Sequence, residues 1–535
     1  MILEPSGRFL CTLVFCALVW CCTPVLSSDD DVDYYSSVAG LEKLLKTEQV
    51  LLTDLKNYIA TTKHNIEVLE KEILKIEAEH KTASINIENY LTNPVNAYRL
   101  IKRLFYDWHK YEEHFEKVKD NEQLKEWKTK KSQLHFPNKV DFEESALALV
   151  RLQQTYNLDV GQVASGILNG IKYGNEMSWT DCLLLGQQLV NARAFNQTKD
   201  WINESMKRYS LEEGSSSVST LDFMEKLGEN LMKTGDIDGA LEVLRAVVVK
   251  DPQRLRVVSE IYNNTYLLPE AYEEEKEYHR TQEFKLYEKV CREEIVRTPA
   301  EERDLRCRYY WGVDNAFVLS PFKIEEINED PYVMLLHDMV TDKQIATIKE
   351  IAMPYMKRST VRDDSSGGSK RRNYRISKNA WLEYTLHPHT EKLLRDLHYA
   401  TGLETQFSEE LQVANYGLGG HYEPHVDFYL TGVTEEYSNR ISTSIFYLSD
   451  VEQGGATAFP YLKIAIKPTK GSVLFWYNLH RSLDGDYRTK HAGCPVLKGS
   501  KWIGNVWTHD RTQFAVRPCG LYRDDESSWE YMMVK

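Results

Sequence analysis

The chain has 535 residues, of which 42% are hydrophobic and 27% are charged, an ordinary composition for a globular protein of about three domains. Its formal net charge of -14 argues against nucleic acid as a partner, because nucleic-acid binding requires a basic surface. An acidic surface tolerates a basic polypeptide substrate, although it also simply favours solubility.

The N-terminus has the features of a secretory signal peptide. Arg8 precedes an apolar run at residues 9–22 that is too short to cross a bilayer. We expect residues 1–27 to be removed, with a short membrane anchor as the alternative, and no later run approaches the length of a membrane span. The sequons at Asn196, Asn203 and Asn263 fit a protein of the secretory lumen.

Five cysteines remain after the signal peptide: Cys182, Cys291, Cys307, Cys494 and Cys519. In an oxidising compartment, cysteines that are near each other are expected to pair. The local choices are Cys291 with Cys307 and Cys494 with Cys519, which leaves Cys182 unpaired. Zinc ligation is the alternative, but no CxxC spacing supports it.

The region 28–140 is expected to be helical. Within residues 41–76, apolar side chains recur at alternating steps of three and four for about five heptads, which predicts a coiled coil and self-association. An amphipathic helix packed on its own domain is the alternative. A second helix is expected to begin near Pro94 and to reach residue 118, and the segment around Pro137 predicts a boundary.

Residues 141–260 have the pattern of paired helices. Between residues 220 and 253 the spacing resembles the 34-residue tetratricopeptide repeat, and a weaker echo begins near Trp179. The positions that match are Leu227, Gly228, Leu231, Gly235, Ala240, Leu244 and Pro252. Stacked helix pairs suit an extended peptide ligand, and a plain helical spacer is the alternative. Residues 261–330 are expected to be a charged helical linker with a disulfide.

After Pro331 the chain changes to short alternating runs separated by glycine-rich or polar turns. Segments 441–448 and 472–479 are rich in β-branched and aromatic residues and predict strands. A helix is expected near residues 341–353, ended by Pro354. Several strands joined by such turns predict a jelly-roll, or double-stranded β-helix, over residues 331–520, with a tail at 521–535. The chain is therefore expected to be a multidomain α + β protein.

The segment HYEPHVD carries candidate metal ligands. His421, Glu423, His425 and Asp427 share one face of an extended strand, so four groups compete. Pro424 is expected to mark the start of the strand, which leaves His425 and Asp427 inside the barrel. With His491 on a later strand, two imidazoles and one carboxylate leave one side of a metal open, which is the ligand set of non-heme Fe(II) oxygenases.

Lys501 is a candidate for anion binding because apolar and aromatic residues follow it on a predicted strand. Iron brings two positive charges, Asp427 one negative and Lys501 one positive, so a ligand with two negative charges neutralises the site. Burial demands such a balance. A 2-oxo acid with a distal carboxylate, namely 2-oxoglutarate, fits it.

These residues also carry a resemblance to a known family. The chain resembles the α subunits of collagen prolyl 4-hydroxylase in NPVNAYRLIKRL, RLQQTYNLD, YRISKNAWL, EELQVANYGLGGHYEPHVDF, GGATAFP, VLFWYNL, GDYRTKHAGCPVL and GSKWIGNVWTHDR. The resemblance implies hydroxylation of peptidyl proline to 4-hydroxyproline in procollagen-like chains. It also implies Fe(II), dioxygen and 2-oxoglutarate, which becomes succinate and carbon dioxide, and L-ascorbate to rescue oxidised iron.

The resemblance assigns roles to residues of this sequence. His425, Asp427 and His491 match the iron ligands, Lys501 the residue that binds the distal carboxylate, and His509 a second basic residue that assists the cosubstrate. Tyr416, Thr443 and Trp507 match residues that line the pocket in related enzymes. The two local cysteine pairs match the family's internal disulfides, the coiled coil its dimerisation region, and the helical repeats its peptide-substrate domain.

Family members assemble as two α subunits with two protein disulfide isomerase subunits in the endoplasmic reticulum lumen, so the same α2β2 assembly is expected. The last residues, MMVK, are no retrieval signal, which fits retention through that partner. Two features depart from the family: His421 stands where relatives have glutamine, and the helix DFMEKLGENLMKT has Phe223 but no tyrosine. The same chemistry on another secreted protein and a non-catalytic scaffold are the alternative functions.

Overall fold

The structure is a computed structural model. It describes residues 34–61, 66–109, 111–112, 122–191, 195–212, 220–233, 235–265, 279, 281–362, 369–370, 374–430 and 438–520. The predicted signal peptide, the end of the predicted helix at 113–118 and the tail at 521–535 lie outside these residues. Within the described ranges, none of the helices has the length and apolar character needed to cross a bilayer.

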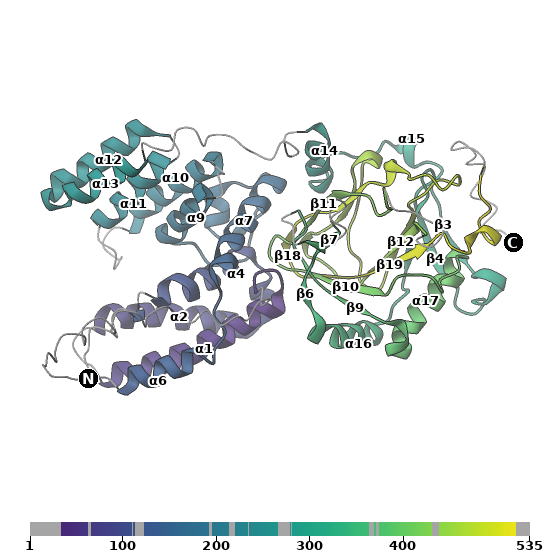
Figure 1. The fold of residues 1–535 in the computed structure, drawn as a ribbon, viewed down its shortest axis with the longest axis horizontal. Coiled ribbons are helices and arrows are strands. Elements are labelled where there is room, and N and C mark those ends of the chain that lie inside the picture. Colours follow the sequence, from purple (N-terminus) through teal and green to yellow (C-terminus); the bar gives the residue numbers. More distant parts are fainter. Residues whose placement is uncertain are drawn as a thin grey trace, which may run out of the picture. The chain divides into compact units, whose positions relative to one another are not determined.

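The chain from residue 34 to residue 265 is mainly helical (Figure 1). Its helices are α1 (Val38–Thr61), α2 (Ile66–Ile85), α3 (Ile87–Leu91), α4 (Pro94–Lys102), the π-helix η1 (Arg103–Asp107), α6 (Glu122–Lys131), α7 (Lys139–Tyr156), α8 (Val160–Ala164), α9 (Trp179–Asn191), α10 (Phe195–Glu212), α11 (Thr220–Lys233), α12 (Ile237–Lys250), the 3-10 helix η2 (Pro252–Arg254) and α13 (Leu255–Thr265). A hairpin of β1 (Ile167–Leu168) and β2 (Ile171–Lys172) interrupts them. As predicted, α4 begins at Pro94, where the Asn93 side chain accepts hydrogen bonds from the backbone of Val95 and Asn96.

Among the described residues, the apolar stripe at residues 41–76 lies on α1 and α2. Its buried members are Leu41, Leu45, Leu52, Leu55, Leu69, Ile73 and Ile76. All but Leu69 belong to one hydrophobic core that the chain forms with itself. A period of three and four predicts that a face is covered but not what covers it. This packing agrees with the alternative interpretation, in which an amphipathic face is buried on its own domain.

The region 141–260 contains the predicted pairs of helices, α9 with α10 and α11 with α12, which share a hydrophobic cluster. Glycine allows the helices to approach closely, since a Cβ at Gly228 would lie 2.5 Å from Cδ2 of Leu244. At the equivalent position of the first pair, a Cβ at Gly186 would lie 3.2 Å from Cγ1 of Ile202. The motif glycines thus mark contacts between paired helices. Of the sequon residues, Asn203 and Asn263 are exposed, and the side chain of Asn196 is not described.

The predicted disulfides are wrong. Cys291, at the end of α14 (Gln282–Cys291), is bonded to Cys494, 203 residues further along the chain, with their Cα atoms 5.7 Å apart. Cys307 and Cys519, the predicted partners, are free and exposed, and Cys182 is buried. The reason is that α14 packs on the small sheet described below, so that Cys291 meets Cys494 in one apolar cluster. Proximity along the sequence did not predict this contact.

The C-terminal part is built on two antiparallel sheets. The large one has the strand order β3-β4-β5-β16-β12-β19-β10-β9-β6 and the small one β11-β17-β14-β15. The strands of the large sheet are β3 (Cys307–Tyr310), β4 (Phe322–Asn328), β5 (Val333–His337), β6 (Lys357–Arg358), β9 (Lys378–Leu382), β10 (Leu411–Tyr416), β12 (Arg440–Tyr447), β16 (Val473–Tyr477) and β19 (Lys501–His509). Those of the small sheet are β11 (Tyr422–His425), β14 (Thr457–Phe459), β15 (Ile464–Ile466) and β17 (His491–Gly493). Two short pairs are β7 (Val361–Arg362) with β8 (Ser369–Lys370), and β13 (Gln453–Gly454) with β18 (Val496–Lys498).

The β region differs from the prediction in where it begins. The sheet starts at Cys307, before the expected boundary at residue 331, because β3 and β4 pair with each other and β4 with β5. The short helix α15 (Pro299–Glu302) precedes it. The predicted strands correspond to β12 and β16, and the predicted helix to α16 (Asp342–Ala352), whose N-terminus is capped by Thr341 and Gln344.

Alternation along the strands of the large sheet separates two cores. Even positions of β19 such as Trp502 and Val506 pack with α16 and α17 (Pro388–Thr401) in one hydrophobic cluster. Ile503, together with Tyr416, Tyr447 and Trp476 from neighbouring strands, belongs to a second cluster shared with the small sheet. Lys501, on the same side of β19 as Ile503, therefore faces the interior between the two sheets.

Candidate metal centre

The two candidate histidine ligands are neighbours across the small sheet. β11 and β17 are antiparallel, and His425 is the register partner of His491. Side chains at directly opposite positions point to the same face of a sheet. Strand pairing therefore brings together two residues that are 66 positions apart in the sequence.

The strand that carries His425 differs from the prediction. Pro424 does not mark the start of β11, which begins at Tyr422, and the register shifts between Tyr422 and His425. Proline cannot donate to a ladder and is tolerated at such a bulge. The shift places Tyr422 and His425 on one face, where their rings stack with centroids 3.5 Å apart. Asp427 lies two residues beyond the end of the strand, so the shared face of a strand is not what places it beside His425.

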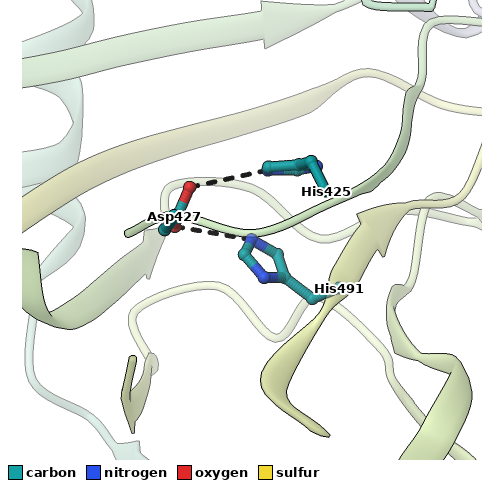
Figure 2. Close-up of side chains that lie close together, drawn as sticks. All are labelled: His425, Asp427 and His491. Atoms are coloured by element: carbon teal, nitrogen blue, oxygen red, sulfur yellow. Dashed lines mark ion pairs between the residues drawn. The ribbon is translucent and has the colours of Figure 1, made fainter. Parts of the chain in front are cut away.

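His425, Asp427 and His491 converge on one point (Figure 2). One ligand atom from each lies within 4.8 Å of the others, and this is the sole such group in the part of the chain that the structure describes. Nε2 of His425 is 3.6 Å from Oδ1 of Asp427, and Nε2 of His491 is 3.4 Å from Oδ2. The predicted ligand set is thus assembled by the fold.

Both imidazoles are oriented by backbone carbonyls. Nδ1 of His425 lies 2.8 Å from the carbonyl oxygen of Glu423, and Nδ1 of His491 lies 3.1 Å from that of Thr489. A carbonyl only accepts, so Nδ1 carries the proton and Nε2 keeps its lone pair for a metal. Burial lowers the pKa of His425 to about 3 and also lowers the pKa of His491, so both rings are neutral near pH 7.

Asp427 is held as a carboxylate in a fixed orientation. Burial alone would raise its pKa, but the two imidazoles and Arg440 lower it below the usual range. Thr443 Oγ1 and Trp507 Nε1 donate to Oδ2 of Asp427 at 2.8 and 2.9 Å. The predicted pocket residues Thr443 and Trp507 therefore contact a ligand carboxylate directly.

Behind Trp507 lies an ion pair that the sequence prediction missed. The guanidinium of Arg440 lies 4.1 Å from the centroid of a Trp507 ring and donates to the main-chain oxygen of Asp427 at 3.4 Å. Glu409 accepts from Arg440 and from Nε2 of His509, at 3.0 Å in the second case. Burial alone would raise the pKa of Glu409, but His509 and Arg440 lower it to about 2. The sequence offers one signal for this ion pair: Arg440 is a charged residue directly before the β-branched run ISTSIF.

His509 is consequently at the metal end of β19. It lies eight residues from Lys501, about 26 Å along an extended strand, so the two do not act on the same carboxylate. Its second nitrogen, Nδ1, is 2.9 Å from the Ser438 hydroxyl. His509 therefore contacts the group that supports Trp507, and its predicted assistance to the cosubstrate stays a prediction.

Lys501 is a buried cation. Only 2% of it is exposed, and its ammonium has no hydrogen-bond or ion-pair partner among the described residues. The rings of Tyr416 and Tyr447 lie 5.7 and 6.0 Å from Nζ, and the Tyr447 hydroxyl is hydrogen-bonded to Thr457 at 2.8 Å. Burial lowers the pKa of Lys501 to about 7. A desolvated, unpaired ammonium is unfavourable unless a ligand brings the opposite charge.

His421 is not a member of the group that His425, Asp427 and His491 form. It precedes the register shift, and its Nε2 lies 3.9 Å from Glu423 Oε1 instead of facing the metal ligands. Burial and the Arg151 guanidinium lower its pKa to about 3. Glu423 in turn contacts His279 at 3.0 Å. The extra imidazole thus belongs to the other side of β11.

The donor set fits Fe(II). Two neutral imidazoles and one carboxylate occupy one side of a metal and leave positions for small ligands, which suits ferrous oxygenases. Lys501 fits the distal carboxylate of 2-oxoglutarate, since it is the one buried cation of the barrel interior that has neither anion nor hydrogen-bond partner in the described ranges.

Comparison with known proteins gives two family matches. Residues 37–170 match the model described as "Prolyl 4-Hydroxylase alpha-subunit, N-terminal region". Residues 411–509 match the 2OG-Fe(II) oxygenase superfamily. The second match spans the three candidate ligands and Lys501.

Similar proteins cover nearly the whole chain. Human prolyl 4-hydroxylase subunit alpha-1 is 34% identical over 514 residues, which are 91% of this chain and 96% of that protein. The Caenorhabditis elegans subunit alpha-2 is 34% identical over 515 residues, 93% of this chain and 95% of that protein. A solved structure, the 2OG complex of viral collagen prolyl hydroxylase vCPH from Paramecium Bursaria Chlorella virus-1, is 24% identical and covers 33% of this chain and 94% of its own. Its TM-score of 0.28 is too low to bear on the geometry described above.

Proposed function

The chain belongs to the family of prolyl 4-hydroxylase alpha subunits, and from this premise we propose that its substrate is proline in procollagen-like chains. The reaction converts peptidyl proline to 4-hydroxyproline. One oxygen atom of dioxygen enters the proline, and the other enters succinate as 2-oxoglutarate loses carbon dioxide. The observation that carries this function is the convergence of His425, Asp427 and His491 in a barrel that also holds the unpaired Lys501.

The residues of the site have distinct tasks. Bound Fe(II), with 2-oxoglutarate, supplies the oxidising chemistry, and the protein holds both and limits side reactions. Nε2 of each histidine and the Asp427 carboxylate hold the metal, while Thr443 and Trp507 fix the carboxylate. Lys501 pairs with the distal carboxylate of the cosubstrate. The rings of Trp476 and Phe459, 4.6 and 5.7 Å from that of His491, exclude water from one side of the ligand.

L-ascorbate completes the proposed set of cofactors, as the reductant that restores iron oxidised in turnovers without hydroxylation. Its role is supported by membership in the family. No residue of this chain is assigned to it.

The helix pairs α9–α10 and α11–α12 are proposed to bind the proline-rich peptide, as tetratricopeptide-like repeats. The spacing of the motif and the close helix contacts at Gly186 and Gly228 support the assignment. Because α11 has no tyrosine and aromatic faces grip proline-rich segments, hydroxylation of a different secreted protein is the second candidate.

The proposed assembly is an α2β2 tetramer with protein disulfide isomerase, in the lumen of the endoplasmic reticulum. The disulfide Cys291–Cys494 supports an oxidising compartment. Self-association is proposed for the N-terminal helices. Since the leucines of α1 are buried within the chain, a second copy would have to contact other surfaces of this region or replace intramolecular contacts.

The test is oxygen-dependent decarboxylation of 2-oxoglutarate by the full chain, co-produced with protein disulfide isomerase, with and without a proline-rich collagen-like peptide. We expect the peptide to stimulate carbon dioxide release in parallel with formation of 4-hydroxyproline. The matched control is His491→Ala, which should bind the same peptide without turnover.

Three results would point elsewhere. Turnover with other secreted peptides but not with the collagen-like peptide would support the second candidate. Peptide binding with no turnover by any preparation would support a scaffold. Activity in His491→Ala would remove that residue from the ligand set.

A further inference from the structure

Helix α7 contacts the chain immediately before one ligand strand and immediately after the other. We infer that Arg151 and Tyr156, on α7, are positioning residues for the metal centre, which hold the backbone that sets the distance between His425 and His491. The inference rests on the proposed function, since it concerns the same metal site. It adds that the N-terminal helices help to set the geometry of that site.

The first contact is at the turn that leads into β11. Nη1 of Arg151 donates to the carbonyl oxygen of Gly419 at 3.2 Å, three residues before Tyr422. Gly419 has a φ of +54°, and a Cβ there would lie 2.9 Å from the carbonyl oxygen of Ala148 on α7. Leu418, in the same turn, is buried in the hydrophobic core of the N-terminal helices. The turn is thus embedded in the helical region and cannot shift without it.

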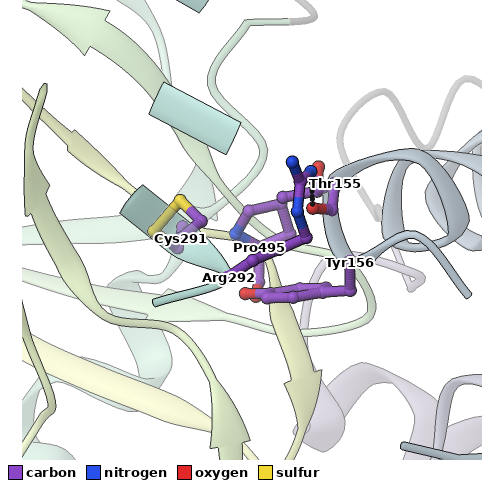
Figure 3. Close-up of a disulfide and its surroundings, with 6 residues drawn as sticks. Thr155, Tyr156, Cys291, Arg292 and Pro495 are labelled. Atoms are coloured by element: carbon purple, nitrogen blue, oxygen red, sulfur yellow. Dashed lines mark hydrogen bonds between the residues drawn. A yellow bond between two sulfur atoms is a disulfide. The ribbon is translucent and has the colours of Figure 1, made fainter. Parts of the chain in front are cut away.

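The second contact is at the chain that leaves β17. The Tyr156 hydroxyl donates to the carbonyl oxygen of Pro495 at 2.5 Å (Figure 3). The preceding residue, Cys494, is bonded to Cys291 of α14, and Arg292 next to it donates to the carbonyl oxygen of Thr155 at 2.8 Å. Pro495 lies four residues after His491 in the sequence. Its position is fixed by α7 through Tyr156 and by α14 through the disulfide of the preceding residue.

These contacts bear on the metal because β11 and β17 are paired. His425 and His491 are opposite each other in that pair, and their separation depends on both strands keeping their register. A metal site tolerates displacements of only about 0.5 Å. Arg151 and Tyr156 lie five residues apart on one rigid helix. They therefore fix the start of β11 and the end of β17 relative to the same helix.

The test measures metal affinity in the full chain co-produced with its partner subunit, by calorimetric titration with Mn(II) without 2-oxoglutarate. Tyr156→Phe should weaken Mn(II) binding by about three- to ten-fold, the effect of one hydrogen bond. Arg151→Met should weaken it similarly, and Arg151→Lys, which keeps a donor, should restore part of the affinity.

The matched control is Tyr98→Phe. Its hydroxyl also donates to a backbone carbonyl, that of Asp181 at 3.3 Å, but within the helical region and away from the ligand strands. This variant should lose a comparable amount of thermal stability and keep the Mn(II) affinity of the unaltered protein. Unchanged affinity in Tyr156→Phe and Arg151→Met, or an equal loss in Tyr98→Phe, would overturn the inference. Absence of Mn(II) binding in the unaltered chain would instead contradict the proposed function.

Discussion

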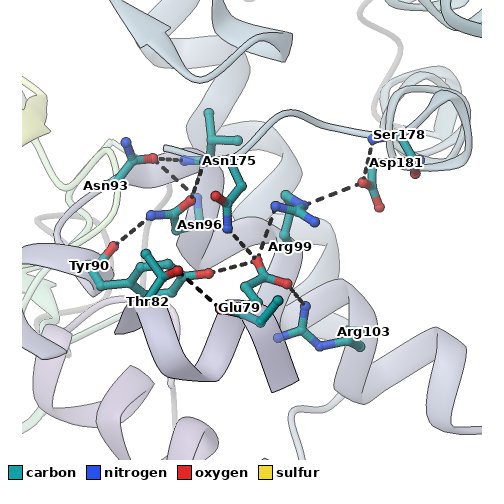
Figure 4. Close-up of polar contacts among 12 residues, drawn as sticks. Glu79, Thr82, Tyr90, Asn93, Asn96, Arg99, Arg103, Asn175, Ser178 and Asp181 are labelled. Carbon is teal, nitrogen blue, oxygen red and sulfur yellow. Dashed lines mark hydrogen bonds and ion pairs between the residues drawn. The ribbon is translucent and has the colours of Figure 1, made fainter. Parts of the chain in front are cut away.

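Two groups of buried charges lie in this chain, and they differ in whether the charges are paired. In the N-terminal helices, Arg103 contacts Glu48 and Glu79, and Lys102 lies 2.9 Å from Asp181. Figure 4 shows Glu79 between the guanidinium groups of Arg99 and Arg103. Burial alone would raise the pKa of Glu79, but Arg103 and Arg99 lower it to about 2. Every acid of this group thus has a basic partner within reach.

The barrel interior is the opposite case. Lys501 is as deeply buried as the charges of the helical network, yet nothing in the described part of the chain neutralises it. A paired buried charge is compatible with a structural role, because removing one member strands the other. An unpaired one is unfavourable in the free protein and marks a place where a ligand supplies the missing charge. The two groups therefore differ in how their charge is balanced: the helical charges neutralise one another, and Lys501 has no such partner among the described residues.

The largest effect is expected at the metal ligands. His491→Ala should lower hydroxylation by at least about a thousand-fold, because the metal loses one of three protein ligands, while the assembly with the partner subunit persists. Product analysis and gel filtration measure the two outcomes. The control is His398→Ala, a helical histidine bonded to the carbonyl oxygen of Leu403, which should retain activity. Dissociation of the His491→Ala complex would mean that this residue maintains the fold.

The paired network should respond in stability. Arg103→Met leaves Glu48 and Glu79 without their main partner and should lower the free energy of unfolding by about 3–5 kcal/mol. Chemical denaturation measures it. In the protein that remains folded, the KM for 2-oxoglutarate should not change. A loss below about 1 kcal/mol would show that the network is not essential to the fold.

The unpaired cation should respond in cosubstrate binding. Lys501→Met keeps the volume and removes the charge, so the KM for 2-oxoglutarate should rise about 100-fold. The melting temperature of the ligand-free protein should stay the same or rise, since an unneutralised buried charge is gone. An unchanged KM would refute the role assigned to Lys501.

The smallest effect is a dependence on pH. The pKa of Lys501, about 7, is below the ordinary value of lysine in an unfolded chain, about 10.4. The folded ligand-free protein therefore releases this proton first, and Lys501 contributes a rise in unfolding free energy between about pH 7 and pH 10, of up to about 1.4 kcal/mol per pH unit. Over the same range the affinity for 2-oxoglutarate should fall by up to about ten-fold per pH unit. Both slopes should be absent in Lys501→Met, and equal slopes in the two proteins would contradict the assignment.

The convergence of His425, Asp427 and His491 could be predicted from the sequence, because these residues lie in short motifs on predicted strands. His425, Asp427, His491 and Lys501 were identified from their types and from the strand pattern around them. Alternation along β19 also predicts that Trp507 shares the face of Lys501, and the structure places its indole on Asp427. Family membership confirms the function that these motifs predicted.

What could not be predicted depends on contacts between distant segments. Alternation failed at Pro424, where a register shift places Tyr422 on the face of His425, a contact that the sequence analysis did not predict. The bond between Cys291 and Cys494 depends on the packing of a helix on a sheet, which spacing does not encode. The apolar stripe at residues 41–76 correctly predicted a buried face. Its period could not show whether the chain's own core or a second copy of the chain covers that face.

The measurement that tests the central claim most directly is the stabilisation that 2-oxoglutarate and Mn(II) give to the protein and to Lys501→Met. A ligand that binds only the folded state raises the free energy of unfolding by RT ln(1 + [L]/Kd). We predict a large increase in melting temperature for the unaltered protein and, at the same ligand concentration, nearly none for Lys501→Met beyond that of Mn(II) alone. An equal increase in both would contradict the account, because the buried ammonium would then have no part in binding the diacid.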